Sequence, residues 1–185
     1  MNKRTIATTA ALLAVGLIIG AFGGHADASP ARKAGTPIAV HAHYTEPAET
    51  TYGAQCDTAS LQCGAVVGGV STYTGSIAGN ETFSCLTEGL PSDGELRYSC
   101  HARFLAPTEV AGCGTGTFSI TITNGETDLT APDLVTQTFP GKADWVVDAG
   151  SGMGDLRRLS GAGHIVWHLN FAGGGYGDVT GTVTC

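Results

Sequence analysis

Hydrophobic and polar residues alternate along several short stretches of this 185-residue chain. The alternation is clearest over residues 96–105, 117–123 and 164–171, where every second side chain is apolar. A period of two places one set of side chains on a buried face and the other on a wet face, as in a β-strand. Val179–Cys185 is expected to form a final strand paired with an earlier one, because a free edge promotes aggregation.

No stretch after residue 29 has a long helical period, and turn residues separate the short apolar runs. We therefore predict an all-β protein, a small antiparallel β-barrel of about eight strands, because closure hides the strand edges. Asn124-Gly125 is typical of a tight hairpin turn.

Residues 150–163 contain five glycines around one apolar pair, Leu156 and Leu159. Glycine disfavours a helix here, and strands are expected on both sides. Leucines three residues apart point the same way in a single helical turn, so the segment is predicted to close one end of the β-structure with these two leucines. Asp155 is expected to cap that turn. The segment lacks the lysine-serine ending of a P-loop and the long helix of a dinucleotide site.

The first residues have the pattern of a signal peptide. Lys3 and Arg4 precede an apolar stretch at Ala10–Phe22, and Ala26-Asp27-Ala28 matches a small-x-small cleavage site. An uncleaved anchor is the alternative, although four glycines interrupt the segment. We predict a secreted protein with three parts: residues 1–28 as signal peptide, residues 29–52 as an extended lead-in with a strand at Ile38–Tyr44, and residues 53–185 as the barrel.

All six cysteines follow the predicted cleavage site, and an even number in an exported chain indicates three disulfides. Of the 15 possible connectivities, we expect Cys56–Cys63 as a local loop, Cys85–Cys100 across adjacent strands, and Cys113–Cys185 as a tie for the C-terminus. The sequence has no C-x-x-C pair, the spacing typical of zinc ligands, so disulfides are favoured over a metal site.

The formal charge is −7, and removal of residues 1–28 takes away Lys3, Arg4 and Asp27, which leaves −8. An acidic chain with no basic cluster argues against nucleic acid or an anionic membrane as partner. We expect no cofactor and no metal, and a small apolar molecule as the partner.

Three segments carry a resemblance to a known family. They are Y-T-G-S-I-A-G-N at residues 73–80, G-C-G-T-G-T-F-S-I-T at residues 112–121, and the stretch from Trp145 to Gly163. The chain resembles the small bacterial domains of unassigned function that share the allene oxide cyclase-like β-barrel. The six cysteines, the leader and the N-terminal extension depart from that pattern and suggest an exported, disulfide-braced variant.

The resemblance implies a calycin-like barrel with an apolar interior, related to plant allene oxide cyclases, dirigent proteins and bacterial cyclases that work without a cofactor. It transfers no catalytic residue to this chain. The inward side chains expected to bind a ligand are Tyr98, Phe104, Phe118, Trp145 and Trp167. The alternative is that these rings fill the core.

Three functions remain open from the sequence. The first is a cofactor-free cyclase or isomerase acting on a small apolar, unsaturated molecule of polyketide or lipid type, a reaction that depends on substrate orientation and one or two hydrogen-bond donors. The second is a non-catalytic carrier of such a molecule. The third is a secreted structural or interaction protein with a filled barrel.

Histidines offer weaker candidates. His41, His43 and Glu46 have spacings compatible with a metal site, but a surface position is the favoured interpretation. His164 and His168 share one face of a predicted strand, and a wet surface is again favoured. No order of Ser, His and Asp can be argued, and G-x-S-x-G is absent from the sequence.

Overall fold

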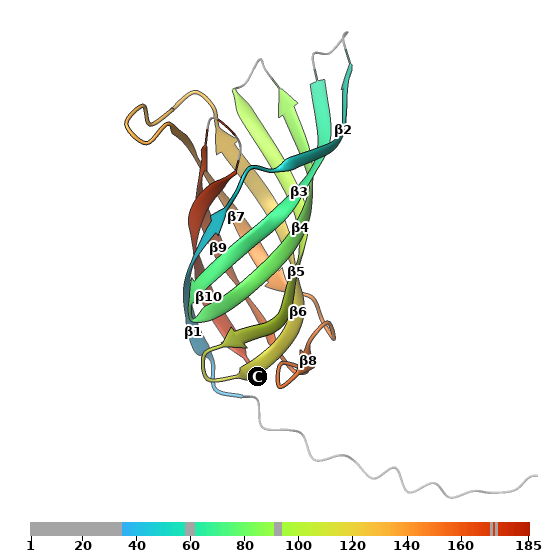
Figure 1. Cartoon of the computed structure of the whole chain (residues 1–185), viewed down its shortest axis with the longest axis vertical. Helices are drawn as coiled ribbons and strands as arrows, with labels where there is room; N and C mark the ends of the chain where they lie inside the picture. The colour runs from blue at the N-terminus through green and yellow to red at the C-terminus, as the bar shows by residue number, and fades with distance from the viewer. Residues whose placement is uncertain (1–34, 58–61, 91–93, 171, 173) are drawn as a thin grey trace, which may run out of the picture. The chain divides into compact units, whose positions relative to one another are not determined.

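The computed structural model describes residues 35–57, 62–90, 94–170, 172 and 174–185. These residues form ten antiparallel strands (Figure 1). The strands are β1 (Ile38–Glu46), β2 (Thr50–Asp57), β3 (Gln62–Gly75), β4 (Ile77–Leu90), β5 (Glu95–Val110), β6 (Gly114–Asp128), β7 (Thr138–Val147), β8 (Met153–Gly154), β9 (Ser160–Asn170) and β10 (Gly175–Thr184). None of the described residues belongs to a helix that is long and apolar enough to cross a membrane.

Eight of the strands form a closed barrel, as the alternation predicts. Neighbouring strands run in the order β1-β10-β9-β7-β6-β5-β4-β3, and β1 also pairs with β3, which closes the ring. The strand expected at Ile38–Tyr44 is β1 itself. It belongs to the barrel wall, so the wall begins at Ile38 rather than at residue 53.

β1 and β2 lie one after the other along the same edge of β3. Residues 42–45 of β1 pair with residues 72–75 of β3, and residues 50–57 of β2 pair with residues 62–68. The break falls at Pro47–Glu49. Proline lacks a backbone N–H and cannot continue a ladder of backbone hydrogen bonds. The ladder along β3 is therefore interrupted between β1, which belongs to the closed barrel, and β2, which pairs with β3 alone among the described strands.

The interior follows the predicted alternation. Phe118 and Ile120 of β6, Phe104 of β5 and Ile165 of β9 are all at most 3 % exposed. The rings of Phe104 and Phe118 stack with centroids 4.3 Å apart. These side chains join a single cluster with Trp145, Leu156 and Leu159. One half of the barrel is therefore a packed core.

The glycine-rich segment closes that half, as predicted (Figure 1). Leu156 and Leu159 are buried, and the turn between them is held by backbone hydrogen bonds three residues apart. Asp155 does not cap this turn. Its Oδ2 accepts a hydrogen bond from the Thr115 N–H of β6 at 3.1 Å, because the short strand β8 pairs with β6 and brings Asp155 beside that strand.

Replacing Asp155 with alanine is expected to lower the free energy of unfolding by about 1.5 kcal/mol, the usual worth of a hydrogen bond to a charged group. Urea unfolding of the purified protein measures this change. Asp178 on β10 is an exposed control, and its replacement should change stability by less than about 0.5 kcal/mol. Equal effects of the two replacements would contradict the assigned role of Asp155.

Asn124-Gly125 does not form a hairpin turn, contrary to the sequence prediction. β6 continues through both residues, and its register shifts there against both β5 and β7. Asn124 has a φ of 55° and donates from Nδ2 to Asp144 Oδ2 at 2.8 Å. The left-handed residue is used for a bulge within a long strand, where flanking pairs on both sides outweigh the local turn preference.

Two predicted disulfides are confirmed. Cys85 and Cys100 face each other across β4 and β5, and Cys113 joins the β5–β6 connection to Cys185 after β10. The backbone register sets Cys56 opposite Cys63, but their side chains lie outside the described part of the chain, so this bond stays a prediction. Disulfides persist in oxidising compartments, which places the folded protein outside the reducing cytoplasm.

Candidate functional site

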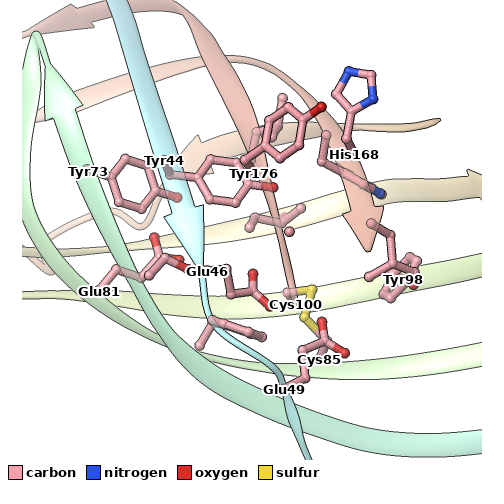
Figure 2. A pocket seen from close by; sticks show the side chains of 17 residues that line it. Tyr44, Glu46, Glu49, Tyr73, Glu81, Cys85, Tyr98, Cys100, His168 and Tyr176 are labelled. Carbon is pink, nitrogen blue, oxygen red and sulfur yellow. A yellow bond between two sulfur atoms is a disulfide. The ribbon is translucent and has the colours of Figure 1, made fainter. Parts of the chain in front are cut away.

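A cavity of about 80 Å³ occupies the half of the barrel away from the leucine plug. Figure 2 shows its lining side chains, which come from β1, β3, β4, β5, β6, β9 and β10 and from Glu49 between β1 and β2. Three glutamates, four tyrosines and Trp167 contribute to the wall, together with the Cys85–Cys100 disulfide. Ligand pockets for drug-sized molecules typically measure roughly 300–1,000 Å³. This cavity therefore suits a much smaller molecule, or one end of a longer one.

The alternation of β1 directs two of its side chains, Tyr44 and Glu46, toward the cavity. Val40, Ala42 and Tyr44 point inward, and the same period brings Glu46 to the cavity at the end of the strand. Glu49 is the last residue of the interruption that begins at Pro47, and it also faces the cavity. The break between β1 and β2 thus places two carboxyl groups at the mouth of the barrel.

Glu81 of β4 is the most buried of the three carboxyl groups, with 3 % of the residue exposed. The hydroxyls of Tyr73 and Ser71 hydrogen bond to it. Burial raises the pKa of Glu81 to about 7, even though both hydrogen bonds act in the opposite direction. Its Oε2 has no hydrogen-bond partner among the described residues. The cavity therefore presents a carboxyl that can gain or lose a proton near neutral pH.

Glu46 and Glu49 share a hydrogen bond and act as a pair. Burial, followed by the charge of Glu49, raises the pKa of Glu46 to about 8. Burial also raises the pKa of Glu49. Two carboxylates at hydrogen-bond distance cannot both ionise readily, so the pair holds a proton between them. Oε1 of Glu46 is buried without a described partner.

Aromatic rings form much of the cavity wall. Tyr44 stacks on Tyr73 with centroids 5.4 Å apart, and Tyr98 meets Trp167 edge-on at 5.7 Å. Trp167 Nε1 donates to Thr127 Oγ1 at 2.7 Å, which fixes the indole ring. Burial raises the pKa of Tyr44, Tyr73 and Tyr98 above the ordinary value. These tyrosines therefore stay neutral and can act as hydrogen-bond donors.

No lysine or arginine is among the described residues that line the cavity. Buried carboxylates are normally paired with a cation or neutralised by a proton. His168 lies at the rim, where its ring stacks on Tyr176 with centroids 5.0 Å apart. Glu81 is buried, whereas Glu46 and Glu49 are half-buried, so a proton or a ligand is needed above all at Glu81. Acid–base chemistry is the reactivity that this arrangement supports.

The structure divides the five predicted ligand-binding residues into two groups. Tyr98 and Trp167 line the cavity. Phe104, Phe118 and Trp145 lie in the packed half and surround a space of only about 10 Å³. Trp145 Nε1 donates a hydrogen bond to the Thr180 carbonyl oxygen at 3.0 Å and so links β7 to β10. Ligand binding by any of the five stays a prediction.

The predicted histidine candidates do not assemble a metal site among the described residues. His41 and His43 lie on the outer face of β1, opposite to Glu46. His43 Nδ1 lies 3.0 Å from Asp178 Oδ1, and His164 Nδ1 lies 2.7 Å from Asp144 Oδ1. The surface interpretation is confirmed for His41, His43 and His164. His168 is half-buried at the cavity rim.

The sequence prediction missed the carboxyl cluster. Glu81 lies at the same parity as Phe83 and Cys85 in β4, and Glu46 at the same parity as Val40 and Ala42 in β1. The sequence signal that could have revealed the cluster is a glutamate at a position whose neighbours on the same strand face are apolar. Ile77, before the register shift between Ala78 and Glu81, is buried at the same parity as Glu81.

No protein-family model matches this chain, and no curated protein matches it. Among solved structures, the chain is similar to a protein of unknown function from the DUF3224 family of Shewanella oneidensis MR-1. The two share 13 % identity with a TM-score of 0.54, over 81 % of this chain and 98 % of that one. This likeness shows the fold alone, a small β-barrel of the DUF3224-like fold, and it does not define an activity.

Proposed function

We propose that this protein binds a small molecule in the open half of its barrel and isomerises or cyclises it without a cofactor. The open half is the half away from the leucine plug, which contains the cavity. Glu81 is the group that exchanges a proton with the bound molecule, and Tyr73 and Ser71 hold its carboxyl in place. The observation that carries this proposal is the buried Glu81 carboxyl at the wall of a cavity, with one oxygen unpartnered.

Two physical effects support catalysis in such a site. A closed wall orients a flexible substrate, which removes entropy from the reaction barrier. A general acid or base works best when its pKa lies near the operating pH, and burial raises the pKa of Glu81 to about 7. The resemblance to allene oxide cyclase-like barrels, which implies cofactor-free cyclases, agrees with this chemistry. The leader-like N-terminus and the two disulfides agree with action outside the cell.

A carrier function is the second candidate. Phe83, Ile122 and Leu169 give the cavity an apolar wall beside its carboxyl groups. Such a wall retains a small apolar body by burial alone, at roughly 25 cal/mol for each Å² removed from water. A carrier needs no proton exchange, so the two functions differ in one measurable property.

Deuterium exchange separates the two functions. The molecule that copurifies with the protein is returned to it in deuterium oxide, and mass spectrometry follows deuterium on carbon. We expect incorporation with the native protein and a rate about 10²–10⁴-fold lower for Glu81→Gln, the usual contribution of a general acid or base. Glu88→Gln, an exposed change on the same strand, should exchange at the native rate. Binding without exchange by the native protein would leave the carrier function.

A further inference from the structure

We propose that the ligand of this cavity is a small organic cation, an ammonium group on a short apolar body, held by the carboxylates of Glu46, Glu49 and Glu81. The inference rests on the proposed function, since it concerns the same cavity. It narrows the expected partner from an apolar molecule to one with a positively charged end.

The first support is that the site contains buried carboxyl oxygens without hydrogen-bond donors. Glu81 Oε2 and Glu46 Oε1 are buried without described partners, and both side chains face the cavity (Figure 2). An unpartnered buried carboxyl group is costly. An ammonium group has three N–H donors and no acceptor, so it can satisfy oxygens that converge from different strands. No lysine or arginine lining the described cavity competes for that place.

The second support is the aromatic wall. The stacked pair of Tyr44 and Tyr73 and the edge-on pair of Tyr98 and Trp167 flank the carboxyl groups. A cation within about 6 Å of such a ring face gains up to about 2 kcal/mol when water is excluded. Aromatic faces recognise an organic cation better than a strongly hydrated metal ion, which favours oxygen ligands at every position.

The third support is size. A cavity of about 80 Å³ is small beside sites for drug-sized molecules. Its apolar wall continues from the carboxyl cluster to Phe83, Ile122 and Leu169. A molecule with a charged end and one short apolar group matches this division. A long hydrocarbon chain would leave the three carboxyl groups without a partner.

Binding of a cation must compete with protons. The titratable groups that surround Glu81 are Tyr44 and Glu46 on β1, Glu49, Tyr73 on β3 and Tyr98 on β5, and none of them is cationic. His168 on β9 and Tyr176 on β10 lie at the rim. Burial raises the pKa of Glu81 to about 7, so a bound cation displaces a proton. Its affinity therefore rises with pH across neutrality.

Calorimetric titration with benzylammonium and with benzyl alcohol tests the inference, because the two probes have similar shapes and differ in charge. At pH 8 we expect benzylammonium to bind at least tenfold more tightly than benzyl alcohol. Its affinity should fall at least tenfold at pH 6, because a proton competes at Glu81, whose pKa is about 7, and a further proton competes at Glu46, whose pKa is raised to about 8. Glu81→Gln should lose at least tenfold in affinity for benzylammonium and little for the alcohol. Glu88→Gln should bind both as the native protein does.

Equal binding of the two probes by a correctly folded protein would overturn the cation inference and leave the proposed binding cavity intact. Failure of both probes, and of methylammonium and butylammonium as smaller and slimmer cations, would overturn the proposed function and the inference together. Circular dichroism of each variant checks folding. If Glu81→Gln does not fold, Glu46→Gln on a separate strand provides the same comparison.

Discussion

Raising the pH from 5 to 8 is expected to lower the free energy of unfolding, and Glu81 should account for about 3 kcal/mol of the loss. The folded protein holds the Glu81 proton up to about pH 7, whereas the unfolded chain releases it near the ordinary value of 4.5. Between these values the folded state binds more protons, so stability decreases with rising pH. A rise in pKa from 4.5 to about 7 corresponds to roughly 3 kcal/mol. Glu46, whose pKa is raised to about 8, changes stability in the same direction.

Urea unfolding of native protein and of Glu81→Gln at half-unit steps of pH measures this contribution. Glutamine is neutral at every pH. The free energy of unfolding of the variant should therefore fall less with rising pH, by the amount that Glu81 contributes in the native protein. Glu88→Gln is the matched control and should follow the native curve. Parallel curves for Glu81→Gln and the native protein would show that Glu81 is ionised throughout, which contradicts a buried neutral carboxyl.

Removing the Cys113–Cys185 disulfide is expected to lower the free energy of unfolding by about 4 kcal/mol. The bond joins residues that are 72 positions apart. A cross-link of that span removes about 4 kcal/mol of conformational entropy from the unfolded chain. It also fastens the last barrel strand, β10, to the connection between β5 and β6 on another part of the wall. The expected loss is a large part of the stability of an ordinary domain.

The double variant Cys113→Ala, Cys185→Ala tests this expectation in urea without reductant. The matching variant Cys85→Ala, Cys100→Ala removes a bond that spans only 15 residues, and about 3 kcal/mol is expected for it. Its cysteines also lie at the cavity wall, so it is the variant that should disturb ligand binding. A smaller loss for the long-range bond than for the short one would contradict the chain-entropy explanation.

Local patterns predict most of the barrel. The alternation in residues 96–105 and 117–123 identifies the inward faces of β5 and β6, and the glycine-rich segment identifies the leucine plug, because both depend on neighbours in the sequence. Asn124-Gly125 shows the limit of such patterns. A local turn preference is overridden where strands pair on both sides, and this pairing is a tertiary property.

The carboxyl cluster depends on contacts between distant parts of the chain. Glu46 and Glu81 come together only because β1 closes the barrel against β3, and β3 pairs with β4. Tyr73, near the end of β3, brings its hydroxyl to Glu81 across the same contact. Sequence alternation predicts an inward glutamate, but it does not predict which strands meet. Tyr98 and Trp167, by contrast, lie on strands with clear alternation and could be assigned to the interior.

The central claim is that the open half of the barrel holds a small molecule at its carboxyl cluster. Native mass spectrometry of the protein isolated from the cells that make it tests this claim most directly. We predict an added small mass on the native protein and on Glu88→Gln, and its loss from Glu81→Gln. A bare mass for the native protein, persisting after exposure to a small-molecule extract of those cells, would contradict the claim. The same added mass on all three proteins would place the ligand elsewhere.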